Sequence, residues 1–165
     1  SKDYLYSYIR SGSAHCIKEF SVRTGECTRE FDAPGYVYSM CTRQNKLYGN
    51  ALNPDDLQQR DCLVIGEWDL DREGTGQPAR TFVGHTGPVT AMFVTKKRLL
   101  TGSHDGTVKE WSLASGECTR TFRGHCSGGI VSGVLAWNGL LYSSADDGAI
   151  DVWSLETGKL VRKLE

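Results

Sequence analysis

Histidine, serine and aspartate, the residue types of a hydrolase relay, come close together in the middle of the chain. His85 is followed by Ser103 and Asp105, a set that one sheet could assemble into a catalytic triad. A second pair, His125 and Asp147, follows about 40 residues later, at the length of a structural repeat. Because a catalytic centre rarely occurs twice at a fixed period in one domain, we interpret both sets as structural and expect no catalytic residues.

The other chemistry-bearing residues do not form a pattern typical of a metal or cofactor site. The six cysteines include no C-x-x-C pair or other zinc-ligand spacing. The acidic pairs Asp55–Asp56 and Asp146–Asp147 match no calcium-binding loop and are interpreted as loop and turn residues. We therefore expect no metal, no cofactor and free thiols, as in the reducing cytoplasm or nucleus.

The elements that position these residues repeat along the chain. The aligned copies are GECTREF from Gly25, GQPARTF from Gly76, GECTRTF from Gly116 and GKLVRKL from Gly158, and they begin 51, 40 and 42 residues apart. Each period contains short apolar segments and turn signals, such as Asp105–Gly106 before TVKEWSL and Asp147–Gly148 before AIDVWSL. Four strands in a period of about 40 residues leave no room for a helix, so the fold is predicted to be all-β.

This pattern resembles the WD-repeat β-propeller family. The signatures are Gly84-His85 with Trp111-Ser112, Gly124-His125 with Trp153-Ser154, and the Trp-Asp dipeptide Trp68-Asp69. The first two copies are degenerate: Phe20 stands at the first Trp position, and Phe31-Asp32-Ala33-Pro34 replaces the second Gly-His stretch. The resemblance implies a propeller of about four blades, each of four antiparallel strands, with the innermost strand of the first blade absent.

The blade limits follow from the repeats. We expect one propeller segment over residues 1–165, with an incomplete blade over 4–31 and complete blades over 36–83, 88–122 and 129–164. The resemblance implies a closed ring of seven or eight blades. An open arc of about four blades would expose the apolar sides of its first and last blades. We therefore expect a part of a larger ring, while a ring shared by two copies and a small ring closed by the chain alone stay open.

The resemblance also implies a buried polar network in each well-formed blade. The turn Asp accepts from His, the His engages a strand hydroxyl, and that hydroxyl accepts from the Trp indole, so no buried polar group is left unpaired. The candidates are His85, Ser103, Asp105 and Trp111 in the third blade, and His125, Ser143, Asp147 and Trp153 in the fourth. Ala145 stands at the position of Ser103, so either Ser143 supplies the hydroxyl there or the network of the fourth blade is incomplete.

Composition and the resemblance favour protein binding over chemistry. With 19 Lys and Arg against 20 Asp and Glu, the chain has no excess of positive charge to neutralise a phosphate backbone. No apolar run approaches the roughly 18 residues of a membrane span, so neither a membrane nor general nucleic-acid binding is expected. The innermost strands contain no acid or His, which disfavours an enzyme built on a propeller. The resemblance implies a non-catalytic scaffold or adaptor for protein or peptide partners.

The resemblance implies a partner-binding face where loops enter the first strand of each blade and where the second strand turns into the third. Its candidates are Tyr36, Tyr38, Asp55, Asp56, Arg60, Pro88, Thr90, His104 and Asp146. Partners are other proteins or peptides, the remainder of the propeller, or a second copy. The alternative function is RNA or phospho-ligand binding by a basic patch at the opposite face, although ordinary solvated turns explain it too; its residues are Arg43, Lys46, Lys96, Lys97 and Arg98.

Overall fold

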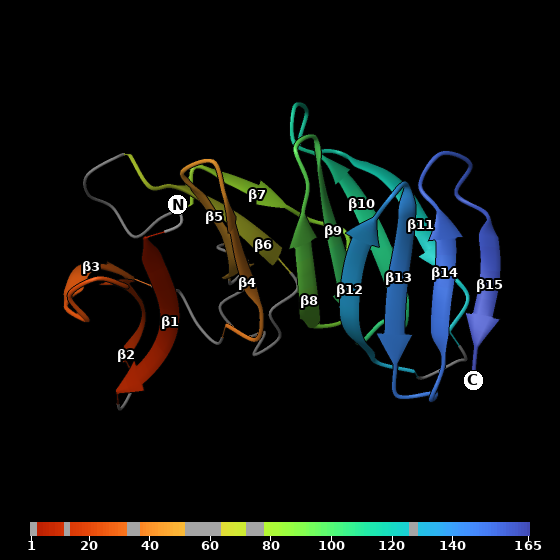
Figure 1. Ribbon diagram of the computed structural model, residues 1–165, viewed down its shortest axis with the longest axis horizontal. Coiled ribbons are helices and arrows are strands. Elements are labelled where there is room, and N and C mark those ends of the chain that lie inside the picture. The colour runs from red at the N-terminus through yellow and green to blue at the C-terminus, as the bar shows by residue number, and fades with distance from the viewer. Residues whose placement is uncertain (1–2, 12–13, 33–36, 52–63, 72–77, 126–128) are drawn as a thin grey trace.

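The computed structural model of the chain is a row of four antiparallel β-sheets (Figure 1). The structure describes residues 3–11, 14–32, 37–51, 64–71, 78–125 and 129–165, and these contain no helix. Sheet 1 contains β1 (Tyr4–Ser11), β2 (Ala14–Ser21) and β3 (Cys27–Asp32), and sheet 2 contains β4 (Met40–Arg43), β5 (Lys46–Ala51), β6 (Val64–Asp69) and β7 (Arg80–Phe82). Sheet 3 contains β8 (Val89–Val94), β9 (Arg98–Ser103), β10 (Thr107–Ser112) and β11 (Cys118–Arg123). Sheet 4 contains β12 (Val131–Trp137), β13 (Leu140–Ala145), β14 (Ile150–Ser154) and β15 (Leu160–Leu164).

Every sheet is a simple meander, in which strands that follow one another in the chain pair side by side. The first strands of neighbouring sheets lie beside each other, β4 next to β8 and β8 next to β12 (Figure 1). Sheet 1 has three described strands, and its outer strand β3 has the same sequence pattern, CTRxF, as β11. The strand that sheet 1 lacks is therefore the counterpart of β4, β8 and β12.

The core lies between the sheets rather than inside any one of them. One buried cluster joins Ile17 of sheet 1 to Leu47 and Trp68 of sheet 2, and a second joins sheet 2 to sheet 3. The third cluster joins Phe122 of sheet 3 to Trp153 of sheet 4. Each sheet therefore buries its apolar residues by packing on its neighbours, as expected for a repeat architecture.

The Asp-Gly signals lie at the turns between the second and third strands of sheets 3 and 4. Gly106 and Gly148 have φ values of 75° and 81°, in the left-handed region that glycine adopts without steric strain. The turns and the alternating strands confirm the all-β prediction, with four sheets and an incomplete first one. No helix in the described residues is long and apolar enough to cross a membrane.

The cysteines of the described residues form no disulfide and differ in exposure. Cys27 and Cys118 are exposed, while Cys41 is packed against the core cluster between sheets 2 and 3, and burial raises the pKa of its thiol to about 12. Because the thiolate is the reactive form, we expect iodoacetamide at pH 8 to alkylate Cys27 and Cys118 at least about tenfold faster than Cys41. Peptide mass spectrometry of timed samples measures the three rates. Unfolding in urea is the control that should equalise them, and equal rates in the native chain would contradict the packing of Cys41.

Candidate functional site

The first His–Asp set forms a continuous chain of buried hydrogen bonds in sheet 3. His85 Nδ1 lies 2.7 Å from Asp105 Oδ2, and His85 Nε2 lies 2.8 Å from the hydroxyl oxygen of Thr101. The same hydroxyl accepts a hydrogen bond of 2.8 Å from the indole Nε1 of Trp111. The network thus fastens the turn after β9 to the loop before β8 and to the middle strand β10.

The hydroxyl that bridges His85 and Trp111 belongs to Thr101, not to Ser103 as expected from the sequence. Ser103 Oγ instead donates to the Gly87 carbonyl at 2.8 Å and accepts from the backbone N–H of Asp105 at 3.1 Å. Residues two apart on a strand share a face, so both hydroxyls point the same way. Ser103 lies at the end of β9 beside the turn, and only Thr101 is deep enough in the sheet to reach the indole.

The second network, in sheet 4, has the same form with serine in place of threonine. His125 Nε2 lies 2.8 Å from Ser143 Oγ, which also accepts from Trp153 Nε1 at 3.1 Å. His125 Nδ1 lies 3.2 Å from both carboxylate oxygens of Asp147. Ser143 is 42 residues after Thr101, so the two hydroxyls occupy equivalent positions.

Asp105 accepts the hydrogen bonds that close the turn of sheet 3. Burial raises the pKa of its carboxyl, but hydrogen bonds from His85 and Thr107 outweigh burial and leave the pKa below its usual value. Because an ionised carboxylate can only accept, the proton of His85 is on Nδ1, and this N–H donates a hydrogen bond to Asp105. Thr101 then accepts from Trp111 and donates to His85 Nε2, so every polar group of this hydrogen-bond network has a partner.

Neither network is arranged for catalysis. His85 is 5% exposed and Thr101 is fully buried, so no substrate could reach the hydroxyl that a relay would activate. The same bonds recur in sheet 4, where they hold the equivalent turn between the second and third strands. This repetition is typical of a structural role. The described part of the chain also contains no group of three residues able to hold a metal ion.

Two of the residues expected to bind partners, His104 and Asp146, lie in equivalent turns at one rim of the row. The N–H of His104 donates to the carbonyl of Pro88 at 2.9 Å, and the N–H of Asp146 donates to the carbonyl of Ile130 at 3.1 Å. These equivalent bonds tie each second-strand turn to the loop entering the first strand, at the lower ends of β8 and β12 (Figure 1). The side chains of His104 and Asp146 are exposed there.

Thr90 does not belong to the exposed part of this rim. Its hydroxyl donates to the carbonyl of Val131 in the neighbouring sheet, and its side chain is partly buried. Thr90 therefore joins the first strands of sheets 3 and 4 rather than meeting a partner. Tyr36, Asp55, Asp56 and Arg60 lie outside the described residues.

Tyr38 is the large side chain of this rim that faces solvent, with 59% of its surface exposed. Asn50 holds the backbone at this position: its side-chain oxygen accepts from the N–H groups of Tyr38 and Ser39 at 3.1 and 3.0 Å. The Asn50 amide donates to the carbonyl of Val89 at 2.7 Å, which links sheet 2 to sheet 3. Sequence reasoning missed Asn50, and the available signal was a polar residue inside the otherwise apolar segment LYGNAL.

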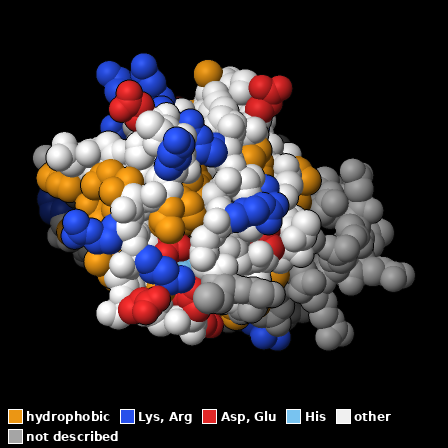
Figure 2. All heavy atoms as spheres, turned by 90° about the vertical axis from the view of Figure 1, so that its right-hand side faces the viewer, with side chains coloured by type: hydrophobic (Ala, Val, Ile, Leu, Met, Phe, Trp, Pro, Cys, Tyr) orange, Lys and Arg blue, Asp and Glu red, His pale blue; other side chains and the backbone are white. Residues whose placement is uncertain are grey.

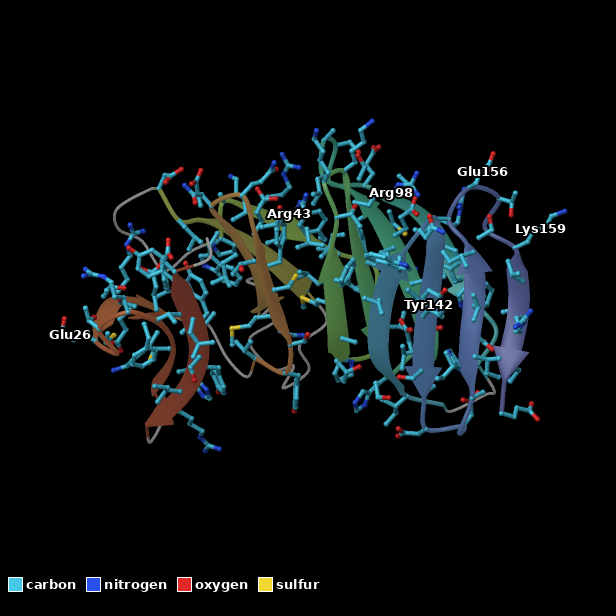
Figure 3. All side chains as sticks on the ribbon, in the orientation of Figure 1. Glu26, Arg43, Arg98, Tyr142, Glu156 and Lys159 are labelled. Atoms are coloured by element: carbon cyan, nitrogen blue, oxygen red, sulfur yellow. The ribbon has the colours of Figure 1, made fainter. Side chains whose placement is uncertain are left out.

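The basic residues of the alternative function lie at the opposite rim, where Figure 3 labels Arg43 and Arg98. Two of these cations are neutralised within the sheets. Lys46 Nζ lies 3.1 Å from Asp69 Oδ2, and Arg98 Nη1 lies 2.9 Å from Glu110 Oε2. The exposed cations that remain without a partner in the described residues are Arg43, Lys96 and Lys97. The positive charge of this rim is therefore smaller than the sequence indicated.

Comparison with known proteins identifies the repeats. The family model described as "WD domain, G-beta repeat" matches residues 76–112 and 116–154, the segments that contain the two networks. Protein LST8 homolog of Dictyostelium discoideum is 34% identical over 125 residues, which are 73% of this chain and 37% of that protein. WD repeat-containing protein RUP1 of Arabidopsis thaliana is 28% identical over 134 residues, 79% of this chain and 34% of the relative. Actin-interacting protein 1 of Drosophila melanogaster is 37% identical over 70 residues, 41% of this chain and 11% of that protein.

The chain thus spans about a third or less of the length of these curated relatives. Among solved structures, the computationally designed Ika4 protein matches with a TM-score of 0.72 and 25% identity, over 94% of this chain and 87% of that one. The designed Ika8 protein matches with a TM-score of 0.69 and 24% identity, over 95% of this chain and 48% of that one. The four-sheet row, the two His–Asp networks and the repeat matches agree, and the chain belongs to the WD-repeat family of β-propellers.

Proposed function

We propose that the chain is a non-catalytic scaffold whose rim around Tyr38, Pro88, His104 and Asp146 binds a protein or peptide partner. The observation that carries the proposal is the exposed ring of Tyr38 on a backbone held rigid by the buried Asn50. Tyrosine combines a large contact area with few rotatable bonds, which makes it a preferred anchor at protein interfaces. A fixed backbone lowers the entropy lost when such an anchor is buried.

The relatives support a binding role of this general kind. Actin-interacting protein 1 is named for an interaction with another protein, and a relative from Homo sapiens is named for an F-box beside its WD repeats. The polar networks support the same role from the structural side, because they use the chain's His–Asp–hydroxyl sets to hold turns rather than to react. Free thiols in the described residues fit a reducing compartment such as the cytoplasm or nucleus.

The Tyr38→Ala variant tests the proposal. We expect it to weaken capture of a partner at least about tenfold, because a buried tyrosine anchor contributes more than about 1.4 kcal/mol. The measurement is quantitative affinity purification from cell extract, followed by titration of the captured protein on the immobilised chain. The matched control is Tyr4→Ala, which removes another exposed tyrosine from the start of β1.

Both variants should unfold at the same urea concentration as the natural chain, since neither side chain is buried. If the partner binds the Tyr38→Ala variant as strongly as the Tyr4→Ala variant, the assignment of this rim is overturned.

A further inference from the structure

The two ends of the row carry opposite halves of a contact that is made three times within it. At the junction of sheets 3 and 4, the face of sheet 3 presents Leu100, Val108 and Phe122, which are 0–2% exposed because sheet 4 covers them. We call this the forward face of a sheet, and we call the face that packs onto the preceding sheet its backward face. Sheets 1 and 2 are covered in the same way by the sheets that follow them.

Sheet 4 has the same forward face, and no described residue covers it. The residues 42 positions after Leu100, Val108 and Phe122 are Tyr142, Ile150 and Leu164. Ile150 and Leu164 are 40% and 42% exposed, and β12 adds Leu135 and Trp137 at 50% and 73%. Figure 2, which looks at the β15 end of the row, shows hydrophobic side chains grouped among lysines and arginines. Tyr142 lies in the middle of this sheet (Figure 3).

The forward face of sheet 4 is also less polar than its counterparts. Sheets 1, 2 and 3 hold a buried glutamate at equivalent positions of β2, β6 and β10, namely Glu19, Glu67 and Glu110. Glu110 accepts from the Thr119 hydroxyl at 2.9 Å, whereas the equivalent pair in sheet 4 is Val152 and Val161. An apolar patch of this kind marks a surface that is covered in the working protein.

An arginine ties each forward face to the next sheet. Arg80 Nη1 of sheet 2 donates to the carbonyl of Leu113 in sheet 3 at 2.7 Å, and Arg120 Nη1 of sheet 3 donates to the carbonyl of Leu155 in sheet 4 at 2.9 Å. Arg29 of sheet 1 donates to the corresponding carbonyl in sheet 2. The equivalent arginine of sheet 4, Arg162, is exposed and has no hydrogen-bond or ion-pair partner among the described residues.

Sheet 1 carries the acceptor that Arg162 lacks. The N–H of Val22 donates to the carbonyl of Asp3 at 2.9 Å, the same bond that positions Leu113 and Leu155 in their sheets. Val22 is therefore their equivalent, yet its side chain is 66% exposed and no described residue donates to its carbonyl.

The glycine beside this acceptor leaves room for the arginine. A Cβ on Gly116 would lie 3.2 Å from the Arg80 side chain, and one on Gly158 would lie 2.8 Å from the Arg120 side chain, because each arginine passes over the glycine of the turn. Gly25, the equivalent in sheet 1, has nothing within 4 Å. The arginine's place in sheet 1 is thus open.

The backward face of sheet 1 is exposed as well. In the other sheets the leucine that pairs with the blade Trp is fully buried, as in Leu47, Leu99 and Leu141. The corresponding residue of sheet 1 is Leu5, which pairs with Phe20 and is 62% exposed. Sheet 1 therefore offers an uncovered leucine and an unoccupied carbonyl, which match the apolar face and the free arginine of sheet 4.

We propose that the forward face of sheet 4 docks on the backward face of sheet 1 of a second copy of this chain, with Arg162 donating to the carbonyl of Val22. A second copy is the occupant whose matching surface is itself part of this structure, and two copies bring together eight sheets. The row matches 48% of the designed Ika8 chain, so two such rows together are about as long as that chain. Two identical contacts then close a symmetric pair.

The mass of the 165-residue chain in solution tests the pairing. We expect sedimentation velocity at micromolar concentration to give twice the chain mass of 18.2 kDa. Arg162→Ala should raise the dissociation constant about a hundredfold, because the symmetric pair loses one hydrogen bond from a charged donor in each of its two contacts, at about tenfold for each bond. Arg123→Ala, which removes an exposed arginine from β11, is the matched control and should leave the mass unchanged. A folded single chain at these concentrations, or species larger than two chains, would overturn the proposal.

A mixing experiment tests the head-to-tail arrangement. Leu5→Asp blocks the backward face and Ile150→Asp blocks the forward face, so each variant alone should sediment as one chain. An equimolar mixture should restore a two-chain species, since one intact contact can still form between the open forward face of the first variant and the open backward face of the second. The native melting temperature of each variant shows that it is folded. Folded variants that stay single chains in the mixture would contradict the pairing of these two faces.

Discussion

Replacing Thr101 with valine is expected to lower the free energy of unfolding by about 2–4 kcal/mol. Valine has nearly the same shape, so the change removes one hydroxyl and leaves the packing of β9 intact. The indole N–H of Trp111 and Nε2 of His85 both bond to that hydroxyl, and both would be left buried without a partner. Each unsatisfied buried group costs about 1–3 kcal/mol. Urea unfolding followed by tryptophan fluorescence measures the loss.

The chain supplies two matched controls for this change. Thr101→Ser keeps the hydroxyl and reproduces the residue that sheet 4 has naturally at Ser143, so we expect a loss below about 1 kcal/mol from the missing methyl group. Ser103→Ala reproduces Ala145 and should cost about 1 kcal/mol, because Ser103 bonds only to nearby backbone. A Thr101→Val variant as stable as Thr101→Ser would show that the network does not hold the sheet together.

The second large effect is expected at Gly102, a position of close approach between sheets 3 and 4. A Cβ at this position would lie 2.5 Å from Val131 Cγ1 and 2.9 Å from Val134 Cγ2, two side chains that pack into the third core cluster. Overpacking of this kind forces strand shifts that typically cost about 1–3 kcal/mol. We expect Gly102→Ala to lie near the upper end, since the neighbouring atoms belong to short branched side chains that cannot swing away.

Gly49→Ala is the comparison for Gly102→Ala in the second strand of sheet 2. A Cβ there would meet its nearest neighbour, Trp68, at 3.6 Å, which is ordinary contact, so the variant should be as stable as the natural chain or slightly more stable. Urea midpoints of the two variants make the test. A Gly102→Ala midpoint equal to that of Gly49→Ala would mean that sheets 3 and 4 are packed less closely than described.

The fold was largely predictable because its signals are local and repeated. The Asp105–Gly106 and Asp147–Gly148 turns, the alternating strands and the period of about 40 residues each depend on near neighbours in the chain. The hydroxyl of the first network was harder to choose. Thr101 and Ser103 share one face of β9, and the depth at which Trp111 crosses the sheet decides between them. The equivalence of Thr101 and Ser143 was the signal that could have identified it.

The partner-binding rim was predictable only in outline. The placement of His104 and Asp146 follows from the turns, but the exposure of Tyr38 depends on the bonds that Asn50 makes to two other segments. Thr90, expected at the rim, points instead to the first strand of sheet 4. Contacts between sheets depend on how whole strands stack, and a single sequence does not encode that stacking in any short pattern.

The placement of the core between neighbouring sheets bears on how this sequence could diverge. A substitution in an end sheet disturbs the one cluster that this sheet shares with its neighbour, and a substitution in sheet 2 or 3 disturbs two clusters. Sheet 1 has Phe20 where sheets 3 and 4 have Trp, and it sits in the same row as both intact networks. Selection can therefore relax on one repeat while it preserves another, and each repeat is free to acquire its own surface residues without loss of the common frame.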